Sequence, residues 1–487
     1  MHAESTDLPK ISLFEALLPV VILIGLLAFN VQVFGDGALS GSNQFALLLA
    51  GFIAAILGYR RKVSFKDMLK NVSANIESTS GAILILLFVG ALSGTWLVSG
   101  IIPAMIYYGL DILKPSIFLP ASVIICSIIS LATGSSWTTS ATVGIALVAI
   151  GSSLGFNVGM VAGAIISGAY FGDKLSPMSD TTNLAPAMAG TDLFTHIRYM
   201  TITTIPSYIL SLVFFIILGL TQETNGTVDT TAMQQAITEA FQINAWLFIV
   251  PVGVIALIVM RTEPLVALFI GTLAAAVFAL IFQPQHVMKL GGGSSLDLPT
   301  AYKGILNAVT VPASIETSDP KLADLFSSKG MSGMLNTIWL IVCAMVFGGF
   351  MEAIGALNVI SESLLKAAKG VLGLFASTVA SCLTLNITAS DQYLAIVVPG
   401  KMFKEAYKKK GLAPENLSRT LEDSGTVTSV LVPWNTCGAY QSNVLGVETM
   451  AYVPYAFFNY ISPFMTLLFA ALSIKIKMMT QKTDQND

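Results

Sequence analysis

Charged residues are scarce in this chain of 487 residues, because Asp, Glu, Lys and Arg together make up only 11% of it. A typical soluble domain carries roughly 25% charged residues. Hydrophobic residues make up 54%, and the few charges leave long uncharged runs between them. The formal net charge of −3 gives no attraction for nucleic acid. The composition therefore excludes an ordinary soluble domain and predicts a protein that crosses a membrane many times.

Cysteine and histidine are also few, and neither is clustered. The four cysteines are Cys126, Cys343, Cys382 and Cys437, each within an apolar run, so we expect packing residues and not metal ligands. The three histidines, His2, His196 and His286, lie far apart in the sequence. No metal set and no nucleophile with its base is visible, which argues against an enzyme and against a cofactor.

Several apolar stretches are long enough to cross the membrane. About 20 helical residues span the ~30 Å hydrocarbon core. The stretches that qualify, or nearly so, are 12–33, 43–59, 80–100, 197–220, 245–260, 264–283, 335–355 and 453–474. The first is not expected to be a removable signal peptide, because its leader holds one lysine, the run is too long and no cleavage site follows.

The orientation follows from the basic residues, which concentrate on the cytoplasmic side of membrane proteins. The stretch 59–75 has five Lys or Arg and the stretch 401–419 has six, whereas 221–242 has none. Both termini are therefore predicted in the cytoplasm of a multi-pass inner-membrane protein. The segment 221–242 becomes an extracytoplasmic linker, and 284–332 becomes an extracytoplasmic insertion.

The chain repeats its own order of elements. A shift of about 256 residues lays 82–113 over 338–369, carries Gly134 to Ser390 and brings Pro206 to within one residue of Pro463. The first half, 11–220, would start inside and end outside, and the second half, 243–475, would do the reverse. We therefore predict an inverted repeat, an organisation typical of secondary transporters.

Polar interruptions occur twice in each half. They are 132–140 and 172–183 in the first half, and 386–392 and 420–436 in the second. Non-helical backbone survives at membrane depth only where protein buries it or where it lines an aqueous cavity. The first interruption of each pair is interpreted as the tip of a re-entrant hairpin, and the second as a break in a crossing helix. The hairpins would span 115–150 and 371–400, and the broken helices 155–190 and 413–450. The predicted fold is all-α, with about 10 transmembrane helices and two re-entrant hairpins.

Three sequence runs now point to a known family. GSSWTTSATVG, GAYFGDKLSPMSDTTNLAP and LSRTLEDSGTVTSVLVPWNTCGAY resemble the NhaC family of sodium/proton antiporters, and the resemblance spans nearly the whole chain. It implies a homodimer with a scaffold domain and a transport domain that moves as an elevator. It also implies Na+ and H+ as the transported partners, although related members exchange carboxylates such as malate and lactate.

The residues of the interruptions suit sodium on their own chemistry. Na+ is a hard cation that prefers carboxylate, hydroxyl, amide and carbonyl oxygens, and an ionisable group at membrane depth is a functional candidate by default. The candidate ion-binding residues are Ser135, Ser136, Thr138, Asp173, Asp180, Thr181, Thr182, Asn183, Ser390, Asp391, Gln392, Glu422, Asp423, Asn435 and Thr436. The predicted sodium ligands among them are Asp173, Asp180, Asp391 and Asn435.

Asp180 is the first candidate for a carboxylate that alternates between sodium and a proton. It lies in the oxygen-rich run SDTTN, and its equivalent in the second half is the neutral pair Asn435–Thr436. Lys174 would balance a carboxylate when no ion is bound.

Several alternatives stay open at this point. Asp173 could simply pair with Lys174, Glu422 and Asp423 could lie at an exposed entry, and Trp137 could only pack the first tip against the other hairpin. A channel would also use polar tips, but it does not need acids in both halves. Carboxylate exchange is the main rival, and it would need a cation or helix N-termini at the site.

Overall fold

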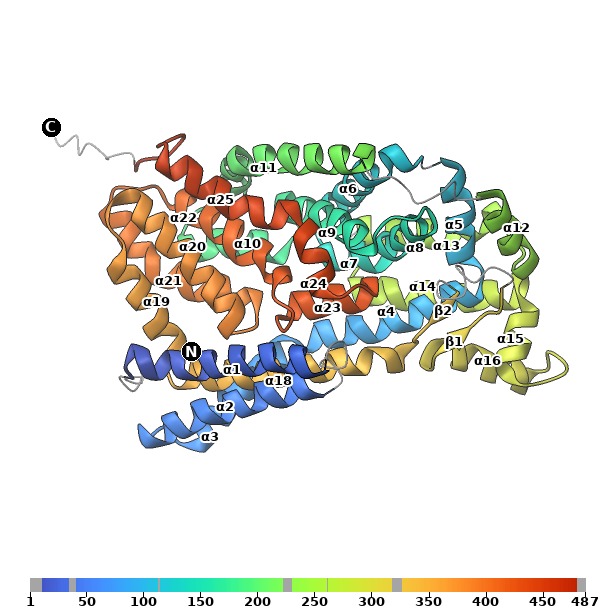
Figure 1. Ribbon diagram of the computed structural model, residues 1–487, viewed down its shortest axis with the longest axis horizontal. Coiled ribbons are helices and arrows are strands. Elements are labelled where there is room, and N and C mark those ends of the chain that lie inside the picture. Colours follow the sequence, from blue (N-terminus) through green and yellow to red (C-terminus); the bar gives the residue numbers. More distant parts are fainter. Residues whose placement is uncertain are drawn as a thin grey trace.

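The computed structural model describes residues 11–34, 41–112, 114–221, 230–260, 262–317 and 326–479. This part of the chain is almost entirely helical (Figure 1). Its one sheet pairs β1 (Ala313–Ser314) with β2 (Ser327–Ser328) in antiparallel register, Ala313 opposite Ser328. The predicted linker 221–242 lies partly outside the described residues, and its second part is α12 (Thr230–Ala240).

Within the described residues, eight helices are long and apolar enough to cross a membrane, or up to ten if two bent helix pairs each count as one span. The eight are α1 (Leu13–Phe34), α2 (Ser42–Arg60), α4 (Ser80–Val98), α6 (Pro115–Thr133), α11 (Leu193–Thr221), α14 (Pro264–Phe282), α18 with its preceding turn (Met331–Ala353) and α20 (Gly370–Thr388). The bent pairs are Thr231–Ala240 with Ala245–Val259, at 85°, and Thr449–Tyr455 with Phe457–Ala471, at 53°. The prediction of a polytopic all-α membrane protein is confirmed.

The remaining helices are shorter and lie between these. In the first half they are α3 (Phe65–Ser78), α5 (Ile101–Ile112), α7 (Ser136–Thr139), η2 (Ser140–Gly144), α8 (Ile145–Ser153), α9 (Val158–Leu175) and α10 (Asp180–Ala189). In the second half they are η3 (Ala245–Phe248), α13 (Ile249–Val259), α15 (Pro284–Gly291), α16 (Leu298–Thr310), η4 (Met331–Met334), α19 (Ala356–Ala367), α21 (Gln392–Lys409), α22 (Pro414–Leu421), η5 (Glu422–Thr426), η6 (Ser429–Leu431), α23 (Thr436–Leu445), α24 (Thr449–Tyr452), η7 (Val453–Tyr455) and α25 (Phe457–Ala471).

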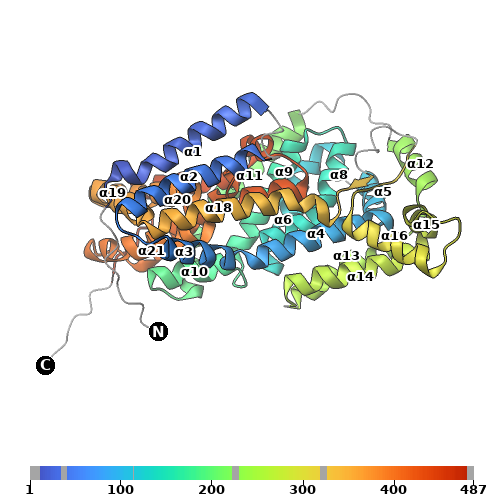
Figure 2. The ribbon, with the colours of Figure 1, turned by 90° about the horizontal axis from the view of Figure 1, so that it is seen from below.

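The helices form two layers. Helices α1, α2, α3, α4, α14 and α18 run side by side along one edge of the molecule (Figures 1 and 2), where α18 packs on α2 and α3 and α14 packs on α4. The hairpins and broken helices lie above them in Figure 1, where α6 packs on α9, α20 on α21 and α11 on α25. Small residues allow the closest of these contacts: Gly168 and Gly172 of α9 lie against the backbone of α6 at Val123 and Ser127. Such small-residue seams replace the hydrophobic driving force that is missing between helices in lipid.

The two halves share their element bounds at the shift of 256 residues. Helix α9 begins at Val158 and α22 at Pro414, while α10 begins at Asp180 and α23 at Thr436. Glycines with positive φ close both half-helices, Gly190 after α10 and Gly446 after α23. The packing follows the same pattern, because α18 on α2 corresponds to α4 on α14.

The predicted insertion 284–332 is folded where it is described. Helices α15 and α16 pack on each other and α16 also packs on α4, while Ser328 of β2 lies 2.8 Å from the hydroxyl of Ser93. The sequence led us to expect a loop here. Its two amphipathic helices were missed because they are too short and too polar to resemble membrane spans.

Candidate functional site

The first hairpin turns at Gly134. Helix α6 ends at Thr133 and Gly134 adopts a left-handed conformation with φ of 69°. Ser135 then begins α7 by accepting a hydrogen bond from the backbone N–H of Thr138 at 3.1 Å. A Cβ on Gly134 would lie 2.6 Å from the Cβ of Met178. The first tip therefore abuts the first helix break, and only glycine fits both the turn and the close approach.

The second hairpin turns at Ser390. Helix α20 ends at Thr388, Ser390 has φ of 59°, and Asp391 caps α21 by accepting from the Leu394 N–H at 2.9 Å. The Ser390 carbonyl accepts from the Thr436 N–H at 3.0 Å. The second tip thus abuts the second break, as the first tip abuts the first.

The first break separates α9 from α10 at Ser176–Ser179, within the predicted 172–183. The hydroxyl of Thr182 donates to the carbonyls of Asp173 and Lys174 at 3.3 and 3.1 Å. The Asn183 amide donates to the carbonyls of Pro177 and Ser179 at 3.0 and 2.7 Å. These side chains satisfy backbone groups that the break leaves free, and neither lines the cavity described below.

The second break follows a π-helical turn, η5, and ends at Asn435, which caps α23 by accepting from the Cys437 N–H at 3.0 Å. The Asn435 amide also donates to the Asn386 carbonyl at 3.0 Å. Asn386 in turn donates to the Gly425 carbonyl at 2.8 Å. Asn386 holds the second break to α20, and the sequence analysis did not single it out although it lies in the polar run 386–392.

A cavity of about 500 Å³ lies where the two tips meet the first break. Its lining includes the candidates Ser135, Ser136, Asp173, Asp180, Thr181, Asp391, Gln392 and Thr436. Its other wall comes from the α3–α4 and α13–α14 turns, with Thr79, Gly81, Thr262 and Glu263. Residues more than 350 positions apart therefore share one polar cavity, including a residue of the acidic type from the turn before α14.

The three aspartates of the cavity differ in environment. The Asp173 carboxylate accepts from the N–H and the hydroxyl of Ser136 at 3.1 and 2.6 Å. Asp180 is exposed at the first residue of α10, whereas Asp391 is 4% exposed. Among the described residues, no three acidic, histidine or cysteine side chains are close enough together to hold a metal ion in this conformation. The acids share the cavity without converging on one point.

Behind the cavity lies a buried ion pair. The Lys174 ammonium contacts the Asp423 carboxylate, and both side chains are fully buried. The hydroxyls of Thr203 and Thr466 donate to the other Asp423 oxygen. The alternative in which Asp173 pairs with Lys174 is therefore wrong for this conformation, because Lys174 points to the second half.

Glu422 and Asp423 are both buried, so the alternative of an exposed entry position is also wrong. The charges follow a basic stretch in the sequence, but the π-helical turn directs them inward. The Thr181 hydroxyl donates to one Glu422 oxygen at 3.1 Å. Glu422, Asp423, Thr138, Ser390 and Asn435 are all within the two-tip assembly but do not line the cavity.

Trp137 packs against α23 and not against the other hairpin. Its ring stacks on Tyr440 with centroids 3.9 Å apart, and the Tyr440 hydroxyl donates to the Trp137 carbonyl at 3.1 Å. Gln392 accepts from the Ser429 hydroxyl at 3.3 Å. The first tip and the second broken helix are thereby joined.

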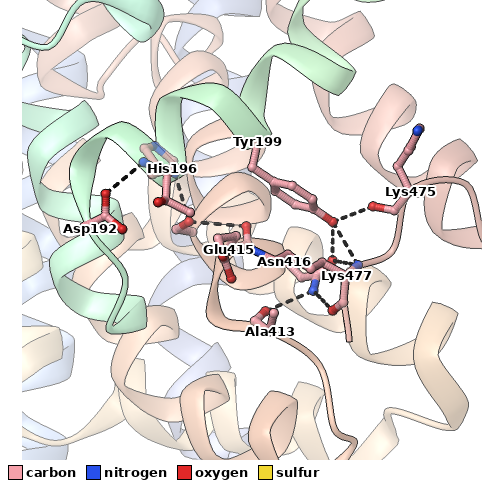
Figure 3. Close-up of polar contacts among 10 residues, drawn as sticks. Asp192, His196, Tyr199, Ala413, Glu415, Asn416, Lys475 and Lys477 are labelled. Carbon is pink, nitrogen blue, oxygen red and sulfur yellow. Dashed lines mark hydrogen bonds and ion pairs between the residues drawn. The ribbon is translucent and has the colours of Figure 1, made fainter. Parts of the chain in front are cut away.

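A second polar cluster was missed by the sequence analysis, and Figure 3 shows it at the start of α22. Tyr199 of α11 donates to Asn416 and to the Lys475 carbonyl, both at 2.6 Å, and Lys477 forms an ion pair with Glu415. His196 contacts Ser418 at 2.8 Å. The segment after α25 therefore ties the second broken helix to α11.

Arg419 belongs to the same region. The sequence analysis counted it with a cytoplasmic basic stretch, but its side chain is fully buried, with the guanidinium carbon 4.7 Å from the Tyr199 ring centre. A helical period read over the short helix α22 would have placed Arg419 on the face of Glu415, four residues earlier.

Comparison with known proteins agrees with this architecture. A model of the Na+/H+ antiporter family matches residues 168–474. The Na(+)/H(+) antiporter NhaC of Alkalihalophilus pseudofirmus is 35% identical over 88% of this chain and 90% of its own length. The malate-2H(+)/Na(+)-lactate antiporter of Bacillus subtilis is 36% identical over 93% of this chain and 92% of its own.

A third relative, the arginine/ornithine antiporter ArcD of Halobacterium salinarum, is 34% identical over 95% of this chain and 93% of its own. The relatives thus share nearly the full length of the chain while their names differ in substrate. The residues quoted above for the resemblance lie largely within the matched range 168–474. The chain therefore belongs to the Na+/H+ antiporter family, with relatives of the NhaC type.

Proposed function

We propose that this protein exchanges Na+ for H+ across the cytoplasmic membrane. The observation that carries the proposal is the cavity between the two hairpin tips and the first helix break, which is lined by Asp173, Asp180 and Asp391. Carboxylate and hydroxyl oxygens are the donors that a hard cation prefers. The names of two NhaC relatives give the same exchange.

Asp180 is the residue that we assign to the ion first. Its side chain is exposed to the cavity, next to Thr181 and Ser179, which also line it. A carboxylate in that place can hold either Na+ or a proton, and one site that holds only one of the two at a time couples their movements in opposite directions. The remaining acids would complete the ligand set when the tips close on the ion.

The charge of the cavity favours a cation over an organic anion. Among its lining residues, Asp173, Asp180, Glu263 and Asp391 are acidic and none is Lys or Arg. The nearest buried cation, Lys174, is already neutralised by Asp423. An anionic substrate would have to overcome this field at close range.

Carboxylate exchange is retained as the second candidate because of size and relatedness. A cavity of about 500 Å³ falls in the range of small-molecule sites, ~300–1,000 Å³. The malate and lactate antiporter resembles this chain about as closely as the NhaC relative does. Arginine or ornithine, the substrates named for the third relative, would suit the acidic lining.

We further propose that transport uses elevator-type movement in a homodimer. The hairpins and broken helices form one packed layer, and the layer with α2 and α18 would be the fixed scaffold. Matching element bounds in the two halves support the inverted repeat. A cross-link between the first tip and α2 should then stop transport, whereas full activity with that cross-link formed would favour local gating.

The orientation proposal keeps both termini in the cytoplasm. Cysteine labelling from outside intact cells should miss positions in 401–410 and reach positions in α12. Labelling of 401–410 from outside would contradict both the orientation and the inverted repeat.

The direct test is Asp180→Asn in everted membrane vesicles. This change keeps the shape of the side chain and removes the exchangeable proton, so the Na+-driven pH change should fall to background while the protein remains inserted. Asp192→Asn is the matched control, because Asp192 is also exposed and also lies at a helix start, where it accepts from the Thr195 N–H.

Near-normal exchange by Asp180→Asn, with an unchanged pH profile, would remove Asp180 as the carrier and favour Asp391 or Asp423. Counterflow in proteoliposomes with labelled Na+, malate, lactate or arginine separates the candidate functions. Accumulation of label from an organic substrate, with none from Na+ alone, would replace Na+/H+ exchange by the second candidate.

A further inference from the structure

The two half-helices that follow the breaks, α10 and α23, meet the scaffold differently. Helix α23 packs on α18 and on α4. Its equivalent, α10, packs instead on α21, α22 and α11. Where α10 would meet α4, the cavity lies between them, and Gly81, Ala82 and Ile85 of α4 line it. The molecule is thus closed at one half-helix and open at the other.

The closed side is held by a side-chain contact. The Asn443 amide of α23 donates a hydrogen bond to the Thr337 hydroxyl of α18. Thr337 is 8% exposed. The shift of 256 residues leads from Thr337 and Asn443 to Gly81 and Ala187, and these two are both exposed. The same pair of positions is therefore in contact in one half and apart in the other.

Gly81 also has free space around it. A Cβ placed on Gly81 would meet no atom within 4 Å. A glycine at the surface of a helix lets a second helix approach closely, yet no helix occupies that place in this conformation. The gap has the position that α10 would fill if the first half took the arrangement of the second.

We propose that Thr337 and Asn443 form the contact that closes the side of the transporter opposite the cavity, and that Gly81 and Ala187 form the equivalent contact in the alternate state. The inference rests on the proposed alternating access and adds the residues that set its two end states. In the exchange of states, α23 separates from α18 while α10 closes on α4. By the predicted orientation, the open side in this structure is the cytoplasmic one.

The energies are compatible with such an exchange. A polar contact between membrane helices is worth about 1 kcal/mol, so the Asn443–Thr337 hydrogen bond can break in every cycle. Because two similar halves trade arrangements, much of the packing lost on one side is regained on the other. Interfaces of this kind have two discrete arrangements and not a continuous range.

The first test places a side chain at Gly81. Gly81→Val fits the open state without a clash but would block the approach of α10, so exchange in proteoliposomes should fall at least tenfold while binding of labelled Na+ is retained. Gly25→Val is the matched control: Gly25 is also an exposed helical glycine with no atom within 4 Å of a built Cβ, but it lies in α1, away from the cavity. Equal exchange by the two variants would overturn the inference.

The second test does not depend on the transported substrate. In T337C/N443C a short thiol-reactive cross-linker should lock the present state and stop exchange, and reduction should restore it. In G81C/A187C the same cross-linker should react slowly in membranes, because the alternate state is visited, and Gly81→Val should make the 337–443 cross-link more complete. The four native cysteines are all buried, which keeps the background low.

Three outcomes separate the gate from the function. Loss of exchange with Na+ binding intact and both cross-links formed supports the assignment. Formation of the 81–187 cross-link in a protein that moves no Na+ would contradict the proposed substrate while supporting the gate. Failure of 81 and 187 to cross-link, or full exchange with 337–443 quantitatively cross-linked, would overturn the gate.

Discussion

The two broken helices occupy equivalent positions and use them for opposite purposes. The first break opens to the cavity, and its Asp180 is exposed. The second break is closed: Asn435 is buried and bonded to α20, and Asp423 is buried against Lys174. At the shift of 256 residues, Asp173 corresponds to Ser429, which donates to the Thr426 carbonyl at 2.6 Å. One half thus presents exchangeable acids to water, while the other supplies fixed partners that hold the assembly.

The largest effect is expected from breaking the ion pair that joins the two breaks. Lys174→Met would leave Asp423 buried without its cation, which typically destabilises a protein by about 3–5 kcal/mol. The thermal midpoint of the detergent-purified protein should fall steeply, whereas Asp180→Asn in the first break should leave it unchanged.

A compensating double variant makes that prediction specific. Lys174→Met with Asp423→Leu removes both charges and should recover most of the lost stability, because no unpaired charge remains. A single Lys174→Met variant as stable as the unchanged protein would show that the pair does not hold the two halves together.

The next effect concerns Asp173, which faces the cavity from the first break. Since Lys174 pairs elsewhere, Asp173 is free to act on the ion, and its bonds to Ser136 tie the first tip to the first break. A charged hydrogen bond is worth about 1.5 kcal/mol, so Asp173→Asn should raise the Na+ concentration for half-maximal exchange about tenfold.

Ser136→Ala should produce a shift in the same direction, and the double variant should be no worse than the stronger single one, because both act through one contact. Fully additive shifts would separate Asp173 from the tip and return it to a purely structural role.

Much of this arrangement was predictable because its signals are local. Apolar runs of about 20 residues predict spans, and Gly134 and Pro177 mark the turn and the break through backbone preference alone. The positions of the cavity aspartates followed from the rule that ionisable residues at membrane depth are functional candidates.

What the sequence did not predict depends on partners distant in the chain. Lys174 has two adjacent carboxylate choices in sequence terms, and only the fold selects Asp423, 249 residues away, over Asp173. Arg419 follows a run of exposed lysines, so its burial beside Tyr199 has no local signal apart from helical phase. The closed contact of Asn443 with Thr337 likewise needs the packing of α23 on α18.

A smaller difference is expected between the asparagines of the two breaks. Asn435 is buried, caps α23 and bonds Asn386, whereas Asn183 is exposed and bonds only carbonyls of its own break. Asn435→Ala should cost about 1–3 kcal/mol, because buried partners are left unpaired. Asn183→Ala should cost less than about 1 kcal/mol, since water replaces the amide. Urea-dependent loss of helicity in detergent would measure both, and an equal or reversed order would contradict the contrast between a closed and an open break.

The smallest effect belongs to the segment after α25, an anchor that packs only on the second broken helix. Lys477 pairs with Glu415, but its side chain is 50% exposed, and exposed ion pairs contribute about 0–1 kcal/mol. The backbone bond from the Ala413 N–H to the Lys477 carbonyl, 2.9 Å long, does not depend on the Lys477 side chain. Lys477→Ala should therefore lower the thermal midpoint only slightly, and 1 M NaCl should remove the difference, because salt screens the pair. Tyr199→Phe, which removes the hydroxyl that donates to Asn416 and to the Lys475 carbonyl, should have the larger effect and should not respond to salt. If Lys477→Ala proved the more damaging of the two, the second break would be held to the segment by charge and not by its hydrogen-bonded backbone.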